Sequence, residues 1–143
     1  MELLDAFEAR SGLICAVGAG GKKTTLYALA RRHPGRIALT ASVYTTFFPD
    51  DLGVVSVIDD ETRLAQRVAA HSGANRLAYA CPGNKPGRYA GVSPERIRQI
   101  HNASGFDATF VKADGARIRW IKAPRPGEPH LPSPACTVLA IAS

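Results

Sequence analysis

The sequence predicts an α/β domain with a mainly parallel sheet flanked by helices, arranged in three layers. Apolar runs of strand length alternate with segments of helical periodicity over most of the chain. The runs are continuous rather than alternating, which is typical of strands buried on both faces of a parallel sheet. The first run, residues 13–17, leads directly into a glycine-rich loop and then into a helix.

Length and composition fit a single domain over residues 1–143 and exclude other classes of protein. Hydrophobic residues make up 45% of the chain and charged residues 21%, which excludes general disorder. No apolar run reaches the roughly 20 residues of a membrane helix, and the acidic start, Met1–Arg10, is unlike a signal peptide. Three cysteines without a CxxC pair predict buried thiols in a cytoplasmic protein rather than a disulfide or zinc site.

In the first half of the chain, the predicted elements follow from apolar spacing and helix-ending residues. Leu26, Leu29 and Ala30 recur at helical spacing, and His33-Pro34-Gly35 ends their helix. The acidic run 59–61 suits the positive N-terminal end of a helix. The predicted elements are helices at 5–10, around 26–30 and at 59–73, and strands at 13–17, 36–40 and 54–58.

The second half continues the alternation, with one long glycine- and proline-rich interruption. Ser93-Pro94 has the N-cap and N1 pattern of a helix start, and Ile97 and Ile100 give that helix an apolar face. The predicted elements are strands at 77–81, 106–111 and 137–142, the helix from 93, a loop at 82–92 and a proline-rich stretch at 122–134.

The glycine-rich loop carries the strongest functional signal. Its four residues can turn backbone N–H groups toward a phosphate, and the next helix adds positive potential. In P-loop NTPases a lysine after the loop reaches the β- and γ-phosphates, and the next hydroxyl binds Mg²⁺. A plain turn into a helix is the alternative. The candidate residues are Gly18, Ala19, Gly20, Gly21, Lys22, Lys23, Thr24 and Thr25.

The doubled lysine leaves the register of this motif open. If Lys22 is the phosphate lysine, a glycine precedes it but no hydroxyl follows; if it is Lys23, Thr24 follows but the preceding glycine is lost. A shorter form of the motif occurs in Mur-type ATP-dependent ligases. We favour Lys23, with Lys22 assisting and Thr24 as a Mg²⁺ ligand. The sequence therefore predicts a P-loop NTPase-like domain that binds ATP or GTP with Mg²⁺.

An aspartate and a basic segment follow the strand predicted at 106–111. Asp114 would lie at the carboxyl edge of the sheet, where ligands bind in such folds, and could hold Mg²⁺ like a Walker B aspartate; a plain Asp-Gly turn is the alternative. With Lys23 it forms the predicted catalytic pair. Arg117 and Lys122 predict either an anion-binding face or a solvated edge strand. Lys85, Arg88 and Tyr89 of the 82–92 loop could line the same pocket.

The charge balance indicates an anionic partner. Lysine and arginine total 18 against 12 acids, giving a formal charge of +6. The chain has no aromatic stripe on a recognisable platform, which disfavours nucleic acid as the partner. A nucleotide or another small anion is therefore the predicted ligand.

Three segments, residues 17–26, 87–95 and 111–129, carry a resemblance that spans nearly the whole chain. The first contains Gly-Ala-Gly-Gly-Lys, the second is a loop and helix start with Ser-Pro-Glu, and the third contains Ala-Asp-Gly-Ala, Lys-Ala-Pro and Glu-Pro. They resemble the VGAGGKTTL segment, the loop and helix start, and the EADGA, KAP and HEP motifs of the selenium-dependent hydroxylase accessory proteins, the YqeC-like family. Two departures stand out: Lys22-Lys23 doubles a single family lysine, and Lys112 replaces a frequent Glu, which leaves Asp114 as the remaining carboxylate.

The resemblance implies a nucleotide-binding accessory protein for the maturation of selenium-dependent molybdenum hydroxylases, acting as an NTPase or as a phosphoryl or nucleotidyl transferase. One alternative is a non-catalytic carrier of an anionic molybdenum cofactor to an apo-hydroxylase, suggested by the basic Arg117–Lys122 segment. Another is part of a Mur-like ligase. Family members typically continue past the KAP and HEP motifs, so we expect an N-terminal nucleotide-binding unit that is either naturally short or truncated.

Overall fold

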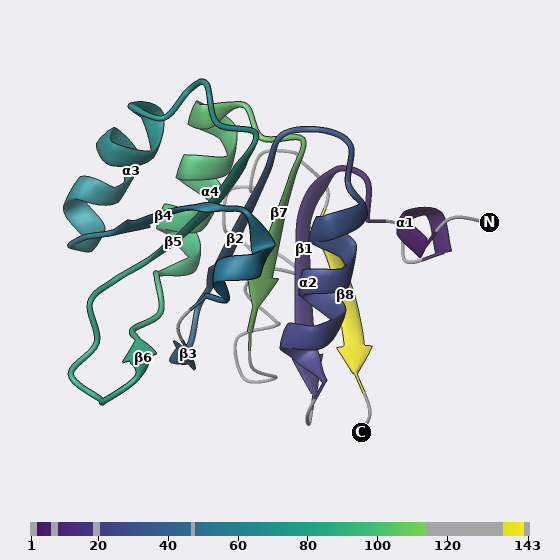
Figure 1. Ribbon diagram of the computed structural model, residues 1–143, viewed down its shortest axis with the longest axis horizontal. Helices are drawn as coiled ribbons and strands as arrows, with labels where there is room; N and C mark the ends of the chain where they lie inside the picture. Colours follow the sequence, from purple (N-terminus) through teal and green to yellow (C-terminus); the bar gives the residue numbers. More distant parts are fainter. Residues whose placement is uncertain (1–2, 7–8, 19–20, 47, 114–135, 142–143) are drawn as a thin grey trace, which may run out of the picture.

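The computed structural model describes residues 3–6, 9–18, 21–46, 48–113 and 136–141. A six-stranded sheet has the order β4-β5-β2-β7-β1-β8, and its neighbouring strands pair in parallel (Figure 1). Its strands are β1 (Gly12–Gly18), β2 (Ile37–Ala41), β4 (Val55–Ile58), β5 (Arg76–Ala80), β7 (Ala108–Lys112) and β8 (Cys136–Ile141). The predicted α/β fold with a mainly parallel sheet is confirmed.

Helices cover both faces of this sheet, which gives the three predicted layers. They are α1 (Leu3–Ala6), α2 (Lys22–Arg32), α3 (Glu61–Ala69) and α4 (Pro94–Ser104), with a short 3₁₀ turn η1 (Asp50–Leu52). Ile14 of β1 packs in one core with α1 and α2, whereas the adjacent Leu13 packs in a second core with α3 and α4. Because successive strand residues face opposite sides, the two cores lie on opposite faces of the sheet.

The carboxyl ends of the strands meet at one edge, the lower edge in Figure 1, where α2 also begins. A small antiparallel pair, β3 (Thr45–Thr46) and β6 (Arg88–Tyr89), lies at the same edge. The segment predicted as a loop at 82–92 therefore contains a strand, and Cys81 bridges to Ala90 at its base. Residues 82–89, which we call the hairpin, are closed by the Cys81–Ala90 bridge, and the pairing of β6 with β3 holds them near the end of β2.

One helix start follows the predicted chemistry, and the end of another helix has a partner that the sequence did not predict. Ser93 caps α4, since its Oγ accepts the N–H of Arg96 at 3.4 Å with Pro94 next in the chain. At the other end of the sheet, the guanidinium of Arg76 donates to the carbonyl oxygens of Ala30 and His33, and so satisfies acceptors that the end of α2 leaves open.

The first helix differs from the prediction: it spans Leu3–Ala6 rather than residues 5–10. The chain turns instead, because the N–H of Ala9 donates to the carbonyl of Leu4 at 2.8 Å. Arg10 then pairs with Asp5 and holds the turn against the short helix. Among the described residues, no helix is long and apolar enough to cross a membrane.

His101 and Thr109 form a buried contact, and we predict from it that the fold loses stability in acid. Their Nδ1 and Oγ1 atoms lie 2.7 Å apart, and burial lowers the pKa of His101, with Asp107 offsetting part of the effect. In the unfolded chain, His101 takes up a proton below its ordinary pKa of about 6.5, whereas in the folded chain burial keeps it neutral to lower pH. The free energy of unfolding therefore falls as the pH falls below about 6.5. Urea unfolding at pH 7.5, 6.5 and 5.5 should show this loss, at most about 1.4 kcal/mol per pH unit.

The variant His101→Gln should flatten the pH dependence between pH 6.5 and 5.5. His71→Gln, at the turn after α3, tests whether the loss of any histidine has the same effect. Equal slopes for wild type and His101→Gln would contradict the assignment.

Candidate anion-binding site

The loop between β1 and α2 ends in a glycine whose backbone is left-handed, a conformation that residues other than glycine rarely adopt. Gly21 has φ 66°, a region that favours glycine, and α2 begins directly after it at Lys22. The first helical hydrogen bond runs from the N–H of Thr25 to the carbonyl of Gly21 at 3.0 Å. The N–H groups of the first turn therefore have no acceptor within the helix, and they point out of its N-terminus.

The side chain of Lys23 is positioned by the small antiparallel pair. Its Nζ donates to the Oγ1 of Thr46 in β3 at 2.8 Å. A hydroxyl holds the ammonium in place without neutralising it. Thr46 pairs in register with Arg88 of β6, so the hairpin brings a further cation to the same place.

A third lysine reaches this place from the sheet. Lys112 ends β7, between Ala16 of β1 and Ala41 of β2, and its Nζ donates to the carbonyl of Tyr44 at 3.0 Å. Burial lowers the pKa of Lys112, and the charges of Lys23, Lys22 and Arg88 lower it further. We call these four side chains the cation cluster: Lys22, Lys23 and Arg88 lie close enough to Lys112 to disfavour its charge.

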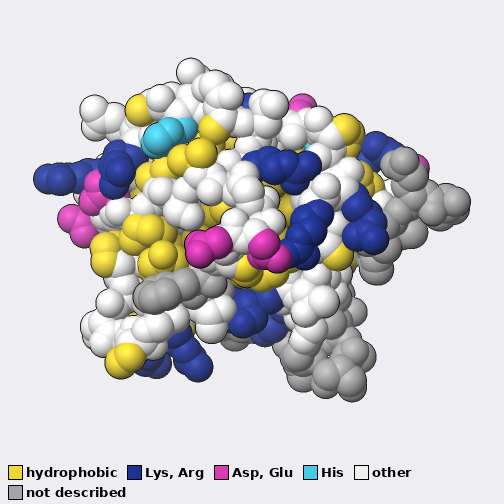
Figure 2. Space-filling model, in the orientation of Figure 1, with side chains coloured by type: hydrophobic (Ala, Val, Ile, Leu, Met, Phe, Trp, Pro, Cys, Tyr) yellow, Lys and Arg dark blue, Asp and Glu magenta, His cyan; other side chains and the backbone are white. Residues whose placement is uncertain are grey.

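Three members of the cluster, Lys22, Lys23 and Lys112, line a cavity of about 250 Å³ together with Gly21 and Thr24. In Figure 2 one group of basic side chains lies near the start of α2, and further basic side chains lie toward its end. The ion pairs among the described residues, Arg10–Asp5, Arg31–Asp51 and Arg67–Asp59, all lie elsewhere. Within the described part of the chain, this cavity combines several cations and helix N–H groups with no paired acid, an arrangement suited to an anion.

The predicted site residues are thus brought together in part. Gly18 ends β1, Gly21 to Lys23 and Thr24 line the cavity, and Thr25 is half-buried in the first turn of α2. The remaining candidates lie outside the described residues: Ala19, Gly20, Asp114, Arg117 and Lys122. Within the described ranges, no three His, Cys, Asp or Glu side chains form a metal-binding group.

Lys112 was missed as a site residue, although the sequence carried a signal for it. It is the charged last residue of an apolar strand, and in a parallel sheet such residues lie at the edge where ligands bind. The residues of the 82–92 loop that were predicted to line the pocket lie in different places. Arg88 joins the cation cluster, whereas Nζ of Lys85 lies 4.3 Å from the ring centre of Tyr44.

Comparison with known proteins identifies the family of this chain. A family model described as YqeC protein matches residues 14–143. The chain belongs to the YqeC family. This confirms the family resemblance predicted from the sequence motifs.

One curated relative of this chain is "Uncharacterized protein YqeC" from Escherichia coli (strain K12). The two are 29% identical over 136 residues, which cover 94% of this chain and 52% of the relative. The present chain therefore spans about half the length of the curated relative that it matches. No solved structure matches it significantly.

Proposed function

We propose that this YqeC-family chain binds ATP or GTP with Mg²⁺, with the phosphates in the cavity at the start of α2. The observation that carries the proposal is the cation cluster itself. Lys22, Lys23 and Lys112 face one cavity beside helix N–H groups, and burial and the neighbouring cations make the charge of Lys112 costly in the free protein. A polyphosphate would offset that cost, because it brings several negative charges to one point.

Within this proposal the glycine-rich loop wraps the phosphates, and the domain is P-loop NTPase-like. Two observations support that assignment: β1, which leads into the loop, pairs in parallel with β7, and β7 ends two residues before Asp114. Thr24 and Asp114 are the proposed Mg²⁺ ligands, and Lys23 and Asp114 the proposed catalytic residues. When bound, the metal would neutralise phosphate charge and orient the phosphates.

The start of α2 at Lys22 helps to decide which of the two adjacent lysines contacts the phosphates. Lys22 is the first helical residue, the position that follows the loop glycine in the P-loop pattern. Lys23, one residue later, is held by Thr46 at the wall of the same cavity. We propose that both ammonium groups bind phosphate, Lys23 from a fixed position and Lys22 from the helix start.

Family membership extends the proposal to a biological role. We infer an NTPase, or a phosphoryl or nucleotidyl transferase, that acts in maturation of selenium-dependent molybdenum hydroxylases. The carrier alternative rests on Arg117 and Lys122, which lie outside the described residues. Nucleotide turnover without affinity for the cofactor would favour the enzyme; tight cofactor binding without turnover would favour the carrier.

Titration of Mg²⁺-ATP and Mg²⁺-GTP by calorimetry tests the nucleotide site. Wild type should bind at least one of them, with affinity that falls as NaCl is raised. Lys23→Ala should weaken binding about tenfold or more, because a charge-assisted hydrogen bond is lost. Arg63→Ala, which removes an exposed cation from α3, should leave the affinity unchanged. Absence of binding by wild type would refute the proposal.

A further inference from the structure

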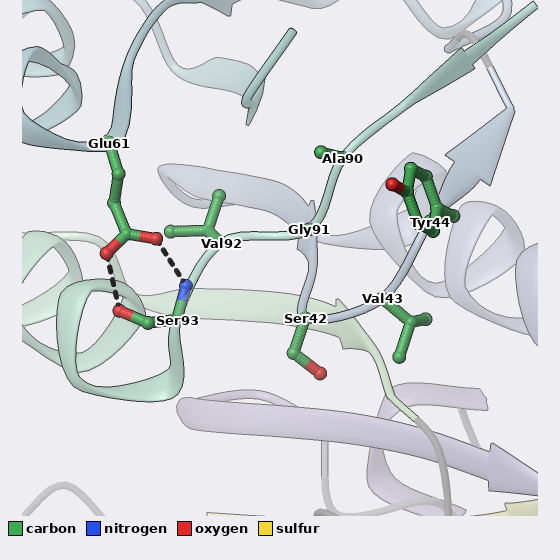
Figure 3. A pocket seen from close by; sticks show the side chains of 8 residues that line it. All are labelled: Ser42, Val43, Tyr44, Glu61, Ala90, Gly91, Val92 and Ser93. Carbon is green, nitrogen blue, oxygen red and sulfur yellow. Dashed lines mark hydrogen bonds between the residues drawn. The ribbon is translucent and has the colours of Figure 1, made fainter. Parts of the chain in front are cut away.

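A second, larger cavity lies beside the cation cluster, on the far side of Lys112. Its volume is about 650 Å³, within the range of small-molecule sites. Two connections and one helix start form its walls: residues 42–44 after β2, residues 90–93 before α4, and Glu61 of α3 (Figure 3). In the sheet β7 separates β2 from β1, so Lys112 stands between this cavity and the loop that follows β1.

The walls of the cavity are joined by short backbone contacts. The N–H of Ser42 donates to the carbonyl of Lys112 at 2.9 Å, and the N–H of Val92 donates to that of Ala41 at 2.8 Å. Gly91 lies so close to the other connection that an added Cβ would be 2.4 Å from the carbonyl carbon of Ser42. The cavity is therefore built before any ligand arrives, which lowers the entropy cost of binding.

A carboxylate is fixed at one end of the cavity. Oε1 of Glu61 accepts the backbone N–H of Ser93 at 2.7 Å, and Oε2 accepts its hydroxyl at 2.8 Å, as Figure 3 shows. Each carboxylate oxygen keeps further acceptor capacity. Among the described residues, none of the ion pairs involves Glu61. A ligand group that donates hydrogen bonds, an amine or a hydroxyl, complements this end.

A serine and a cation lie at the border of the site. Ser42 lines the cavity, but its Oγ is buried and points away from Glu61, so it presents no hydroxyl to a ligand (Figure 3). At the opposite side from Glu61, the carbonyl of Tyr44 accepts Nζ of Lys112, which marks the boundary with the anion site.

We propose that this cavity, the acceptor cavity, binds a small molecule that has an amine or hydroxyl head at Glu61 and an anionic group directed toward Lys112. It would hold this second substrate beside the phosphates of the nucleotide. The role as second substrate rests on the proposed function; the binding chemistry does not. The cavity lies on one side of β7 and the glycine loop on the other, so the two ligands can be bound together.

Amide chemical shifts of the ¹⁵N-labelled full chain test this inference. Phosphoethanolamine and glycerol 3-phosphate, added at millimolar concentration, carry an amine and a hydroxyl head respectively, and inorganic phosphate carries neither. At least one of the first two should shift the amides of residues 42–44 and 91–93. Phosphate alone should shift only those of residues 21–24. Mg²⁺-ATP, added separately, reports on residues 21–24 and so tests the proposed function by itself.

Two variants test the chemistry of the cavity. Glu61→Gln should weaken binding of the effective probe about tenfold, because a charged acceptor becomes neutral while the amide can still cap Ser93. Glu95→Gln, an exposed acid in the first turn of α4, is the matched control and should bind like wild type. Val43→Phe, which adds bulk at the wall without touching the cap, should abolish the shifts at 91–93.

The inference is overturned if both organic phosphates shift only residues 21–24, or if Glu61→Gln and Val43→Phe bind the effective probe as well as wild type does. Either result would leave a positive Mg²⁺-ATP titration intact, so the two proposals can fail separately.

Discussion

Replacing Lys22 and Lys112 together with alanine is expected to reduce affinity for Mg²⁺-nucleotide by at least about a hundredfold. Each ammonium contributes a charge-assisted contact of about 1.5–3 kcal/mol to a bound phosphate, and the two reach the cavity from different elements. Losing both leaves Lys23 and the helix N–H groups alone with the anion. Calorimetric titration of wild type, the two single variants and the double variant measures the effect.

The same double substitution should leave the unliganded protein as stable as wild type, or more stable. Burial and neighbouring cations already disfavour the charged form of Lys112, so removing charge relieves repulsion. The double variant Arg32→Ala and Arg63→Ala, which removes two exposed cations elsewhere, is the control for net charge. Opposite signs for binding and stability would mark a binding site; a parallel loss of both would show that the lysines are structural.

Substituting valine for Gly91 is expected to destabilise the fold by about 3 kcal/mol, which corresponds to roughly 6–12 °C in Tm. A Cβ at this position would lie 2.4 Å from the carbonyl carbon of Ser42 and 2.5 Å from the nitrogen of Val43. Both contacts are backbone, so neither can rotate away. The chain must separate there, which breaks the 2.8 Å hydrogen bond from Val92 to Ala41. Urea and thermal unfolding measure the loss.

Gly73→Ala is the matched control, because an added Cβ there has nothing within 4 Å. It should change stability by about 0.5 kcal/mol or less. A Gly91→Val variant as stable as this control would mean that the two connections are not in contact, and the acceptor cavity would lose its wall.

Hydrophobic pattern was sufficient to predict most of the fold. The strands at 13–17, 36–40 and 106–111 are continuous apolar runs because each is covered on both faces, and they occupy central positions in the sheet. The run at 54–58 looks similar but forms the edge strand β4, where Val55 is 38% exposed. Strand order depends on pairing between distant segments, which local periodicity does not encode.

The candidate site was predicted where its chemistry is local and missed where it is not. The glycine loop and the lysines after it are contiguous, so a motif could find them. Lys112 was missed, and it joins them only because β7 pairs with β1. Arg88 was predicted as a possible lining residue of the 82–92 loop, and it joins them because β6 pairs with β3. Glu61 was predicted as part of an acidic helix start, and its bonds to Ser93 depend on the packing of α3 beside α4.

The position of β1 also has a consequence for how the protein is made. Its two neighbours are late strands: Gly12 pairs with Ala108 of β7, and Leu13 with Cys136 of β8. On the ribosome the glycine loop emerges early, but its strand has no described partner until β7 has been synthesised. A nascent chain would therefore expose an unpaired, apolar strand until β7 emerges, a hazard for association with other chains. The cation cluster would likewise assemble only after β7 has paired beside β1, because Lys112 is the last residue of β7.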